Sequence, residues 1–345
     1  MSQVIDTTVH NRQLSEQFYT WRSAGQPLVL ATVVATAGST YSKAGRHLLI
    51  ADGARYAGLV GGGCLEGDLL TQAESVFATG MPQLVTYDMR DAADDIWGMG
   101  LGCRGMMQLF LQLLDAANDW QPFSDIAAIM TGTLPAAIEL VIAAGASPRH
   151  AGEHAVLRSG VFCATDPATL TEQPDGLQVL RWTVMPAPRL LVLGGGPDAA
   201  AVVNGARELG WHVMVCDHRE TLLEAPALSR ADERVCLAPA QLSARVDLNR
   251  FDAVVVMSHH LPSDQEYLRQ LVTGSHAYVG VLGPAARRAE LLKQLGLQAS
   301  EFGARLRGPV GLAIGADSPA SIALALLAEI HQTLKTHPNS VQVTA

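Results

Sequence analysis

Two cysteines that lie in glycine-rich runs are the residues of this chain best suited to chemistry. Cys64 ends the glycine run of GGGCLEGDLL, and Cys103 lies within GMGLGCRG. Glycine allows a backbone to approach a bulky ligand closely, so the two loops could converge on one site. If Cys64 lies at the start of a helix, the helix dipole lowers its pKa and favours the thiolate, which attacks sulfur or binds a metal. The alternative is that the glycines form tight turns and the cysteines fill space.

The other cysteines have a simpler interpretation. Cys163, Cys216 and Cys236 lie inside short apolar runs, where we expect buried thiols that behave as small hydrophobic side chains. Five scattered cysteines without a CxxC pair do not predict a disulfide framework. We therefore expect free thiols in a reducing compartment.

A second glycine-rich turn follows the apolar run RLLVLG and opens a helical pattern. It contains Gly194, Gly195 and Gly196, and it fits the permissive G-x-G-x-x-G/A form. Such a turn brings a phosphate close to the N–H groups at a helix start. Asp217 ends the next predicted strand about twenty residues later, where an acid would bind a ribose hydroxyl. The pattern predicts a nucleotide-type fold.

Neighbouring residues leave the ligand of this turn open. Pro197 removes one N–H from the turn and Asp198 adds a negative charge, and both weaken the case for NAD. Arg287 and Arg288 follow a later predicted strand, where one of them could pair with a phosphate. The alternative is that both arginines lie on a solvated helix face.

Two histidines follow the predicted strand DAVVVMS. His259 and His260 would lie at the carboxyl end of this strand, which faces the ligand crevice in open α/β sheets. They could bind a metal, shuttle protons or hold an oxyanion. The alternative is that His259 caps the strand and His260 packs. We expect Ser263 or Asp264 to cap the helix that follows.

The elements that must position these residues fall into two groups and predict an α/β protein. Strand-like runs outnumber helical patterns in residues 1–184, which predicts an N-terminal α+β domain. Helices are expected at Asn11 to Ser23, Leu65 to Ala78 and Phe123 to Thr131. In residues 189–345, apolar strands alternate with helices, as in a Rossmann-like doubly wound parallel sheet. Pro186 and Pro188 mark the linker between the two domains.

The last predicted helix has clear start and end signals. Ser318 is expected as its N-cap and Pro319 as its first residue. The final residues, THPNSVQVTA, are expected to form a frayed tail.

Composition limits the function classes. The chain has 345 residues, of which 48% are hydrophobic and 17% charged, and its formal net charge is −9. These values predict a globular protein without the basic surface that nucleic acid requires. No secretory signal pattern and no stretch of eighteen apolar residues is present, so we expect a cytoplasmic protein that does not span a membrane.

Several motifs together resemble the XdhC/CoxI family over nearly the whole chain. They are LVGGGCLEGDLL, GMGLGCRGMMQLFLQLL, VLGGGPDAAAVV, VVVMSHHLPSDQEYL and GPVGLAIGADSPASIALALLAEI. Members of this family are accessory factors for xanthine dehydrogenase and related molybdenum hydroxylases. The resemblance implies a chaperone that binds the molybdenum cofactor while a cysteine desulfurase replaces an oxo ligand by sulfur. It then delivers the cofactor to the apo-enzyme, and a homodimer is expected.

The resemblance also implies roles for individual residues. Cys64 and Cys103 would act at the molybdenum end of the cofactor, through hydrogen bonds, transient ligation of the metal or sulfur relay. Glu66 would orient Cys64 or exchange a proton near it. The expected cofactor-binding residues are Gly62, Gly63, Cys64, Gly102, Cys103 and Arg104 in the first domain, and Gly194, Gly195, Gly196, Asp217, His259 and His260 in the second.

The chain departs from the family pattern at two positions. Arg104 stands where a glycine is common, and Ala313 where an aspartate is common. Both leave the ligand geometry open, and they could mark a paralogue that serves a different molybdoenzyme. The form of the cofactor, mononucleotide or dinucleotide, also stays open.

Two enzymatic alternatives remain beside the chaperone hypothesis. One is an NAD(P)-dependent oxidoreductase that uses the Gly194 turn, with His259 or His260 as its acid or base. The other is a thiol-dependent transferase or hydrolase with Cys64 as the nucleophile, which requires a base within hydrogen-bond reach.

Overall fold

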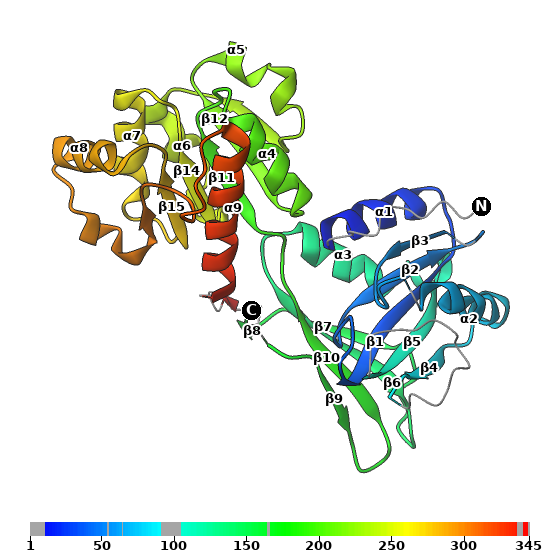
Figure 1. Cartoon of the computed structure of the whole chain (residues 1–345). Helices are drawn as coiled ribbons and strands as arrows, with labels where there is room; N and C mark the ends of the chain where they lie inside the picture. Colours follow the sequence, from blue (N-terminus) through cyan, green and yellow to red (C-terminus); the bar gives the residue numbers. More distant parts are fainter. Residues whose placement is uncertain are drawn as a thin grey trace. The chain divides into compact units, whose positions relative to one another are not determined.

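The chain folds into two compact units that meet at residues 186 and 187. The structure is a computed structural model and describes residues 11–53, 55–63, 65–90, 105–163, 166–336 and 341–343. The first unit runs to Pro186 and the second begins at Ala187 (Figure 1). The C-terminal strand β17 (Val341–Val343) belongs to the first unit, where it pairs with β8 (Gly160–Phe162). The prediction of a frayed tail is therefore wrong for these residues, whose valines suit a strand.

An antiparallel sheet in the order β3-β2-β1-β5-β4 forms the centre of the first unit. The strands are β1 (Leu28–Gly38), β2 (His47–Ala51), β3 (Arg55–Gly58), β4 (Gln83–Asp88) and β5 (Gly105–Leu114). Helix α2 (Glu66–Thr79) covers one face, and α1 (Asn11–Ser23) and α3 (Phe123–Thr131) cover the other (Figure 1). Both faces of β1 are buried, which explains why its sequence is apolar almost throughout.

The register of this sheet gathers several loops at one end. Gly38 at the end of β1 pairs with Gly105 at the start of β5, and Asp88 at the end of β4 pairs with Met106. The β1–β2 loop (residues 39–46) and the loop between β3 and α2 leave the sheet at this same end. Antiparallel pairing thus brings the glycine loop before α2 close to the chain that enters β5.

A second antiparallel sheet of the first unit has the order β7-β6-β10-β9. Its strands are β6 (Ala136–Ala143), β7 (His154–Leu157), β9 (Thr169–Glu172) and β10 (Gln178–Val184). Side chains of β6 and β10 join the core that α1 and α3 form. The sequence did not predict β9, because all four of its residues are exposed and none provides an apolar signal. It also missed β10, the strand beside β9.

The second unit is a parallel sheet in the order β13-β12-β11-β14-β15-β16, which confirms the doubly wound Rossmann-like prediction. Its strands are β11 (Arg189–Leu193), β12 (His212–Asp217), β13 (Glu233–Cys236), β14 (Ala253–Val256), β15 (Tyr278–Val281) and β16 (Leu306–Arg307). Helices α4 (Ala199–Glu208) and α9 (Pro319–Thr336) pack on one face. Helices α6 (Leu242–Arg245), α7 (Leu261–Leu271) and α8 (Ala285–Leu295) pack on the other, and the short α5 (Glu220–Leu223) follows β12.

The helix-start signals gave one correct and one wrong prediction. Helix α9 begins at Pro319, and the N–H of Ser321 donates to Ser318 Oγ at 3.3 Å, as expected for an N-cap. Helix α7 begins at Leu261, earlier than predicted, with His260 as its N-cap residue. Proline is accepted in the first turn of a helix, so Pro262 did not delay the start of α7.

The three apolar-run cysteines differ in exposure. Cys216 is buried as predicted, and burial together with the nearby Asp217 raises the pKa of its thiol to about 12. Cys163 is only partly buried and Cys236 is exposed, so the prediction of a buried thiol is wrong for both. Cys236 ends the edge strand β13, where every second residue faces outward.

Candidate functional site

The glycine loop before α2 is held by a buried carboxylate. Glu66, the first residue of α2, is 1% exposed. Its Oε1 accepts hydrogen bonds from the N–H groups of Val60 at 2.9 Å and Gly61 at 2.7 Å. Its Oε2 accepts a third from the N–H of Gly63 at 2.9 Å. The carboxylate therefore fixes the loop that leads into the helix.

This arrangement changes the role expected for Glu66. A carboxylate that accepts three backbone hydrogen bonds is a structural anchor, and it is poorly placed to exchange a proton with a ligand. It also occupies N–H groups just before α2 and places a negative charge at the helix start. The helix dipole argument for a Cys64 thiolate is weaker for that reason.

The tip of the loop is open backbone. Gly62 and Gly63 are exposed and have φ angles of +69° and +95°, a conformation that favours glycine. A Cβ on Gly62 would lie 3.0 Å from Cδ2 of the Tyr41 ring, whereas a Cβ on Gly63 would meet nothing within 4 Å. The loop therefore presents bare peptide beside an aromatic side chain.

The start of β5, directly after the second glycine loop, lies against the same part of the molecule. A Cβ on Gly105 would lie 2.5 Å from the carbonyl oxygen of Ser39 and 2.6 Å from the methyl group of Thr40. Both residues belong to the β1–β2 loop, which also contains Tyr41. The flanks of the two predicted cysteine loops thus contact one hairpin loop. The predicted residues Cys64, Gly102, Cys103 and Arg104 themselves lie outside the described residues.

The glycine turn of the second unit is packed tightly within its sheet. Gly194 has a φ of +127°, and a Cβ there would lie 2.6 Å from the carbonyl group of Met257. Its N–H donates to the carbonyl oxygen of Cys216 at 2.8 Å. A Cβ on Gly196 would instead meet the ring of His259 at 4.0 Å. Glycine is required at position 194 by close packing.

Asp217 does not face a ligand in the way the sequence predicted. Its Oδ2 accepts from the N–H of Gly195 and from Arg219 Nη2, both at 2.8 Å. Its Oδ1 accepts from the N–H and the Nε of Arg219, both at 2.9 Å. A carboxylate has about four acceptor positions, so these bonds fill them. No position remains for a ribose hydroxyl in this arrangement.

The electrostatics of Asp217 agree with its geometry. Burial alone would raise the pKa of this carboxyl. The hydrogen bonds from Arg219 and from the Gly195 N–H outweigh burial and lower the pKa to about 2. Asp217 is therefore an ionised clamp that joins the glycine turn to Arg219.

The two predicted histidines lie at the end of β14 with different partners. His259 has a φ of +59°, and its Nε2 lies 3.3 Å from Oδ2 of Asp198, the residue before α4. His260 places Nδ1 2.8 Å from Ser263 Oγ. Within the described parts of the chain, no three His, Cys, Asp or Glu side chains form a group that could hold a metal.

A buried network below these histidines was not predicted. Ser258 Oγ donates to Asp264 Oδ1 at 2.5 Å, and Arg287 Nη2 donates to Asp264 Oδ2 at 2.6 Å. Asp264 therefore holds the end of β14 and does not cap α7. Because Arg287 pairs with this carboxylate, Arg288 is the better candidate of the two arginines for the phosphate contact that the sequence suggested.

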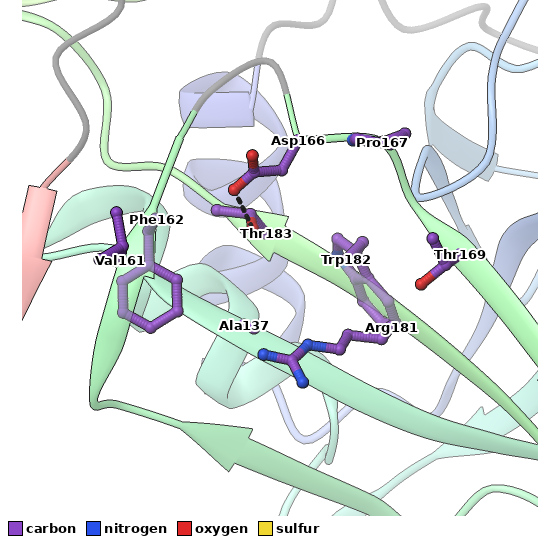
Figure 2. Close-up of a pocket in the computed structure, with 9 residues that line it drawn as sticks. All are labelled: Ala137, Val161, Phe162, Asp166, Pro167, Thr169, Arg181, Trp182 and Thr183. Carbon is purple, nitrogen blue, oxygen red and sulfur yellow. Dashed lines mark hydrogen bonds between the residues drawn. The ribbon is translucent and has the colours of Figure 1, made fainter.

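A small pocket in the first unit lies beside the second sheet (Figure 2). It is lined by Ala137, Val161, Phe162, Asp166, Pro167, Thr169, Arg181, Trp182 and Thr183. Asp166 already accepts from the N–H of Cys163 and from Thr183, and Arg181 lies 3.6 Å from Glu139. Because its charged groups have partners, this pocket is a weaker candidate than the glycine loops.

Comparison with known proteins identifies the family. Residues 21–88 match the model of the XdhC and CoxI family, and residues 190–330 match that of the XdhC Rossmann domain. A protein of Bacillus subtilis (strain 168), named as a probable xanthine dehydrogenase component, is 30% identical over 329 residues, which cover 89% of this chain and 93% of that protein. The chain belongs to the XdhC and CoxI family.

Two further relatives extend this comparison. The "Molybdenum cofactor insertion chaperone PaoD" of Escherichia coli (strain K12) is 24% identical over 310 residues, which cover 89% of this chain and 83% of that protein. A crystal structure from Bacillus halodurans, described as a xanthine dehydrogenase, has a TM-score of 0.77 and 27% identity. It covers 94% of this chain and 96% of its own. Its fold likeness agrees with the α/β architecture seen here.

Three residues that shape the two glycine turns and the end of β14 were not predicted as such from the sequence. Tyr41, Arg219 and Asp264 lie in or beside the motifs of the XdhC and CoxI family, but their partners are distant in the sequence or depend on side-chain direction. An aromatic residue in the polar loop AGSTYSKAG was the available signal for Tyr41.

The helices of the described residues were also compared with the length of a membrane span. Each of them is too short or too polar to cross a bilayer.

Proposed function

We propose that this protein binds the molybdenum cofactor, holds it during sulfuration and delivers it to a molybdenum hydroxylase of the xanthine dehydrogenase type. The observation that supports this most is the contact of both glycine-loop flanks with the β1–β2 loop. Family membership and the name of the E. coli relative point to the same cofactor. In this proposal the protein acts as a chaperone and not as a turnover enzyme.

The residues present fit such a ligand. The exposed backbone at Gly62 and Gly63 offers a surface without side chains, on which a large flat group can lie. Cys64 and Cys103 would then contact the molybdenum end, because thiolates suit this metal. When bound, the cofactor supplies the molybdenum centre that receives sulfur. In the second unit, the Gly194 to Gly196 turn would accept a phosphate of the cofactor.

The partners follow from the same proposal. A cysteine desulfurase would supply the sulfur, and an apo molybdenum hydroxylase would receive the finished cofactor. We propose a homodimer located in the cytoplasm. The cofactor would be a molybdopterin in its mononucleotide or dinucleotide form.

The enzymatic alternatives lose support from the geometry. An NAD(P)-dependent oxidoreductase would use Asp217 to bind the ribose, but the acceptor positions of this residue are filled by Gly195 and Arg219. A hydrolase with Cys64 as nucleophile would need a nearby base. Glu66, two residues away, is engaged by three N–H groups.

A retention experiment tests the proposed function. Purified protein is mixed with molybdopterin released from a donor enzyme and separated by gel filtration, and retained pterin is measured by fluorescence. We expect Cys64→Ala and Cys103→Ala each to reduce retention by about tenfold or more, a loss of about 1.4 kcal/mol. Cys236→Ala, which removes an exposed thiol of the second unit, is the matched control and should retain pterin like the wild type.

Two results would contradict the proposal. Equal retention by wild type, Cys64→Ala and Cys103→Ala would remove the cysteine loops from the site. Retention of NAD in place of pterin would favour the oxidoreductase.

A further inference from the structure

Tyr41 is an exposed aromatic side chain held at the edge of the candidate site. It is 59% exposed, although a ring of this size is usually more buried in a folded protein. Its Cδ2, Cε2 and Cγ atoms lie 3.0, 3.3 and 3.4 Å from the position of a Cβ on Gly62. One part of the ring therefore rests on the glycine loop while the rest meets solvent.

The loop that bears Tyr41 is fixed on both sides. Ser42 is buried and donates through Oγ to the carbonyl oxygen of Leu59 at 3.4 Å, just before the glycine loop. Thr40 packs its methyl group at the Gly105 position and donates through Oγ1 to the Ser42 carbonyl at 2.8 Å. A side chain between two such anchors loses little further conformational entropy when it contacts a ligand.

Glycine at position 62 is what allows this ring position. A Cβ at 3.0 Å from the ring would push Tyr41 away from the loop, and the φ of +69° adds strain for any other residue. The bare peptide of Gly62 and Gly63 and the ring of Tyr41 therefore form one continuous surface. Such a surface suits a flat heteroaromatic group, since aromatic stacking accepts any planar ring.

We propose that the Tyr41 ring stacks on the pterin ring of the bound cofactor and thereby helps the first unit to hold it. This rests on the proposed function, because the ligand is the same. The ring supplies the stacking surface and the glycine backbone supplies the room beside it. Stacking would also cover apolar ring surface that water now contacts, which favours binding.

Substitution of Tyr41 tests the proposal directly. Pterin retention, with molybdopterin released from a donor enzyme as the probe, is measured for the wild type, Tyr41→Leu and Tyr41→Phe. We expect Tyr41→Leu to bind about 5- to 100-fold more weakly, because it loses the ring, and Tyr41→Phe to bind within about twofold of the wild type. Tyr19→Leu, which alters another exposed tyrosine of the same unit, is the matched control.

A glycine pair tests the geometry independently. Gly62→Ala should weaken retention, because its Cβ displaces the Tyr41 ring. Gly25→Ala has nearly the same backbone conformation, φ +67°, and its Cβ would meet nothing within 4 Å. Gly25→Ala thus reproduces the strain without the ring contact, and we expect retention like the wild type.

The outcomes separate this proposal from the proposed function. If the wild type retains no pterin, the proposed function fails. If the wild type retains pterin and Tyr41→Leu retains it equally, the function stands and the stacking proposal is overturned. The stacking proposal is also overturned if Tyr41→Phe is as weak as Tyr41→Leu, since the hydroxyl would then matter and the ring would not. Normal pterin retention by Tyr41→Leu with loss of transfer to the hydroxylase would make Tyr41 a partner contact and overturn it too.

Discussion

Both units contain a glycine turn fixed by a buried carboxylate, but the two carboxylates are balanced differently. Glu66 accepts three backbone N–H groups from the loop just before its own helix. Asp217 accepts one N–H from the turn after β11, and Arg219 fills its remaining positions. The first clamp is local and built from the backbone, whereas the second joins neighbouring strands through an ion pair.

The glycines of the two turns also serve different purposes. Gly62 and Gly63 form an exposed tip, where positive φ angles leave peptide surface open. Gly194 is packed against Met257, where a side chain would collide with backbone. The difference indicates that the first turn is shaped to receive a ligand, and that the second is shaped first of all to close the sheet.

The largest expected effect follows from the packing of Gly194. Gly194→Ala places a Cβ 2.6 Å from the Met257 carbonyl at a φ of +127°, so strand and loop must shift. We expect the free energy of unfolding of the second unit to fall by about 4 kcal/mol. Hydrogen exchange in peptides from β11 and β14 would measure this loss.

Gly63→Ala is the matched change in the first unit. It has a positive φ but no atom within 4 Å of the new Cβ, so only backbone strain of about 1–2 kcal/mol is expected. Equal losses for the two substitutions would show that the two turns do not differ in packing.

The second effect tests the backbone clamp. Glu66→Ala leaves the N–H groups of Val60 and Gly61 buried without acceptors, and we expect a loss of about 3 kcal/mol in the free energy of unfolding. Glu66→Gln keeps one acceptor oxygen and should lose about half as much, because its amide N–H₂ faces the N–H of Gly63. Urea unfolding checks both. A loss for Glu66→Ala below that for Glu66→Gln would contradict the clamp.

Much of the fold was predictable because it depends on local patterns. The helices Asn11–Ser23 and Phe123–Thr131 begin and end where predicted, since their apolar residues recur at helical spacing. The parallel sheet followed from alternating strands and helices. Strand β9 could not be found this way, because an exposed edge strand has no alternation between apolar and polar residues.

The site was less predictable than the fold. The glycine runs and Asp217 were visible in the sequence, but the partner of each carboxylate depends on how the chain closes in space. Nothing in the spacing of Arg219 from Asp217 shows whether the arginine faces the acid or the solvent. The position of Tyr41 depends on the pairing of Gly38 with Gly105, which brings the β1–β2 loop to the glycine loop.

The smallest of these effects tests the ion pair of the second clamp. The pKa of Asp217 is about 2 in the folded protein and about 3.9 in an unfolded chain. A depressed folded pKa contributes stability above the unfolded pKa, and this contribution disappears as the pH falls through the folded pKa. We expect Asp217 to contribute about 2 kcal/mol at pH 7 and almost nothing near pH 2.

The variant Asp217→Asn isolates that contribution. Its difference from the wild type in free energy of unfolding should be about 2 kcal/mol at pH 7 and shrink between pH 5 and pH 2, because asparagine does not titrate. Urea unfolding of both proteins across this pH range measures it. A constant difference would mean that Asp217 acts through hydrogen bonds of either amide or acid. The second clamp would then depend on hydrogen-bond geometry, as the Glu66 clamp does, and not on its charge pair with Arg219.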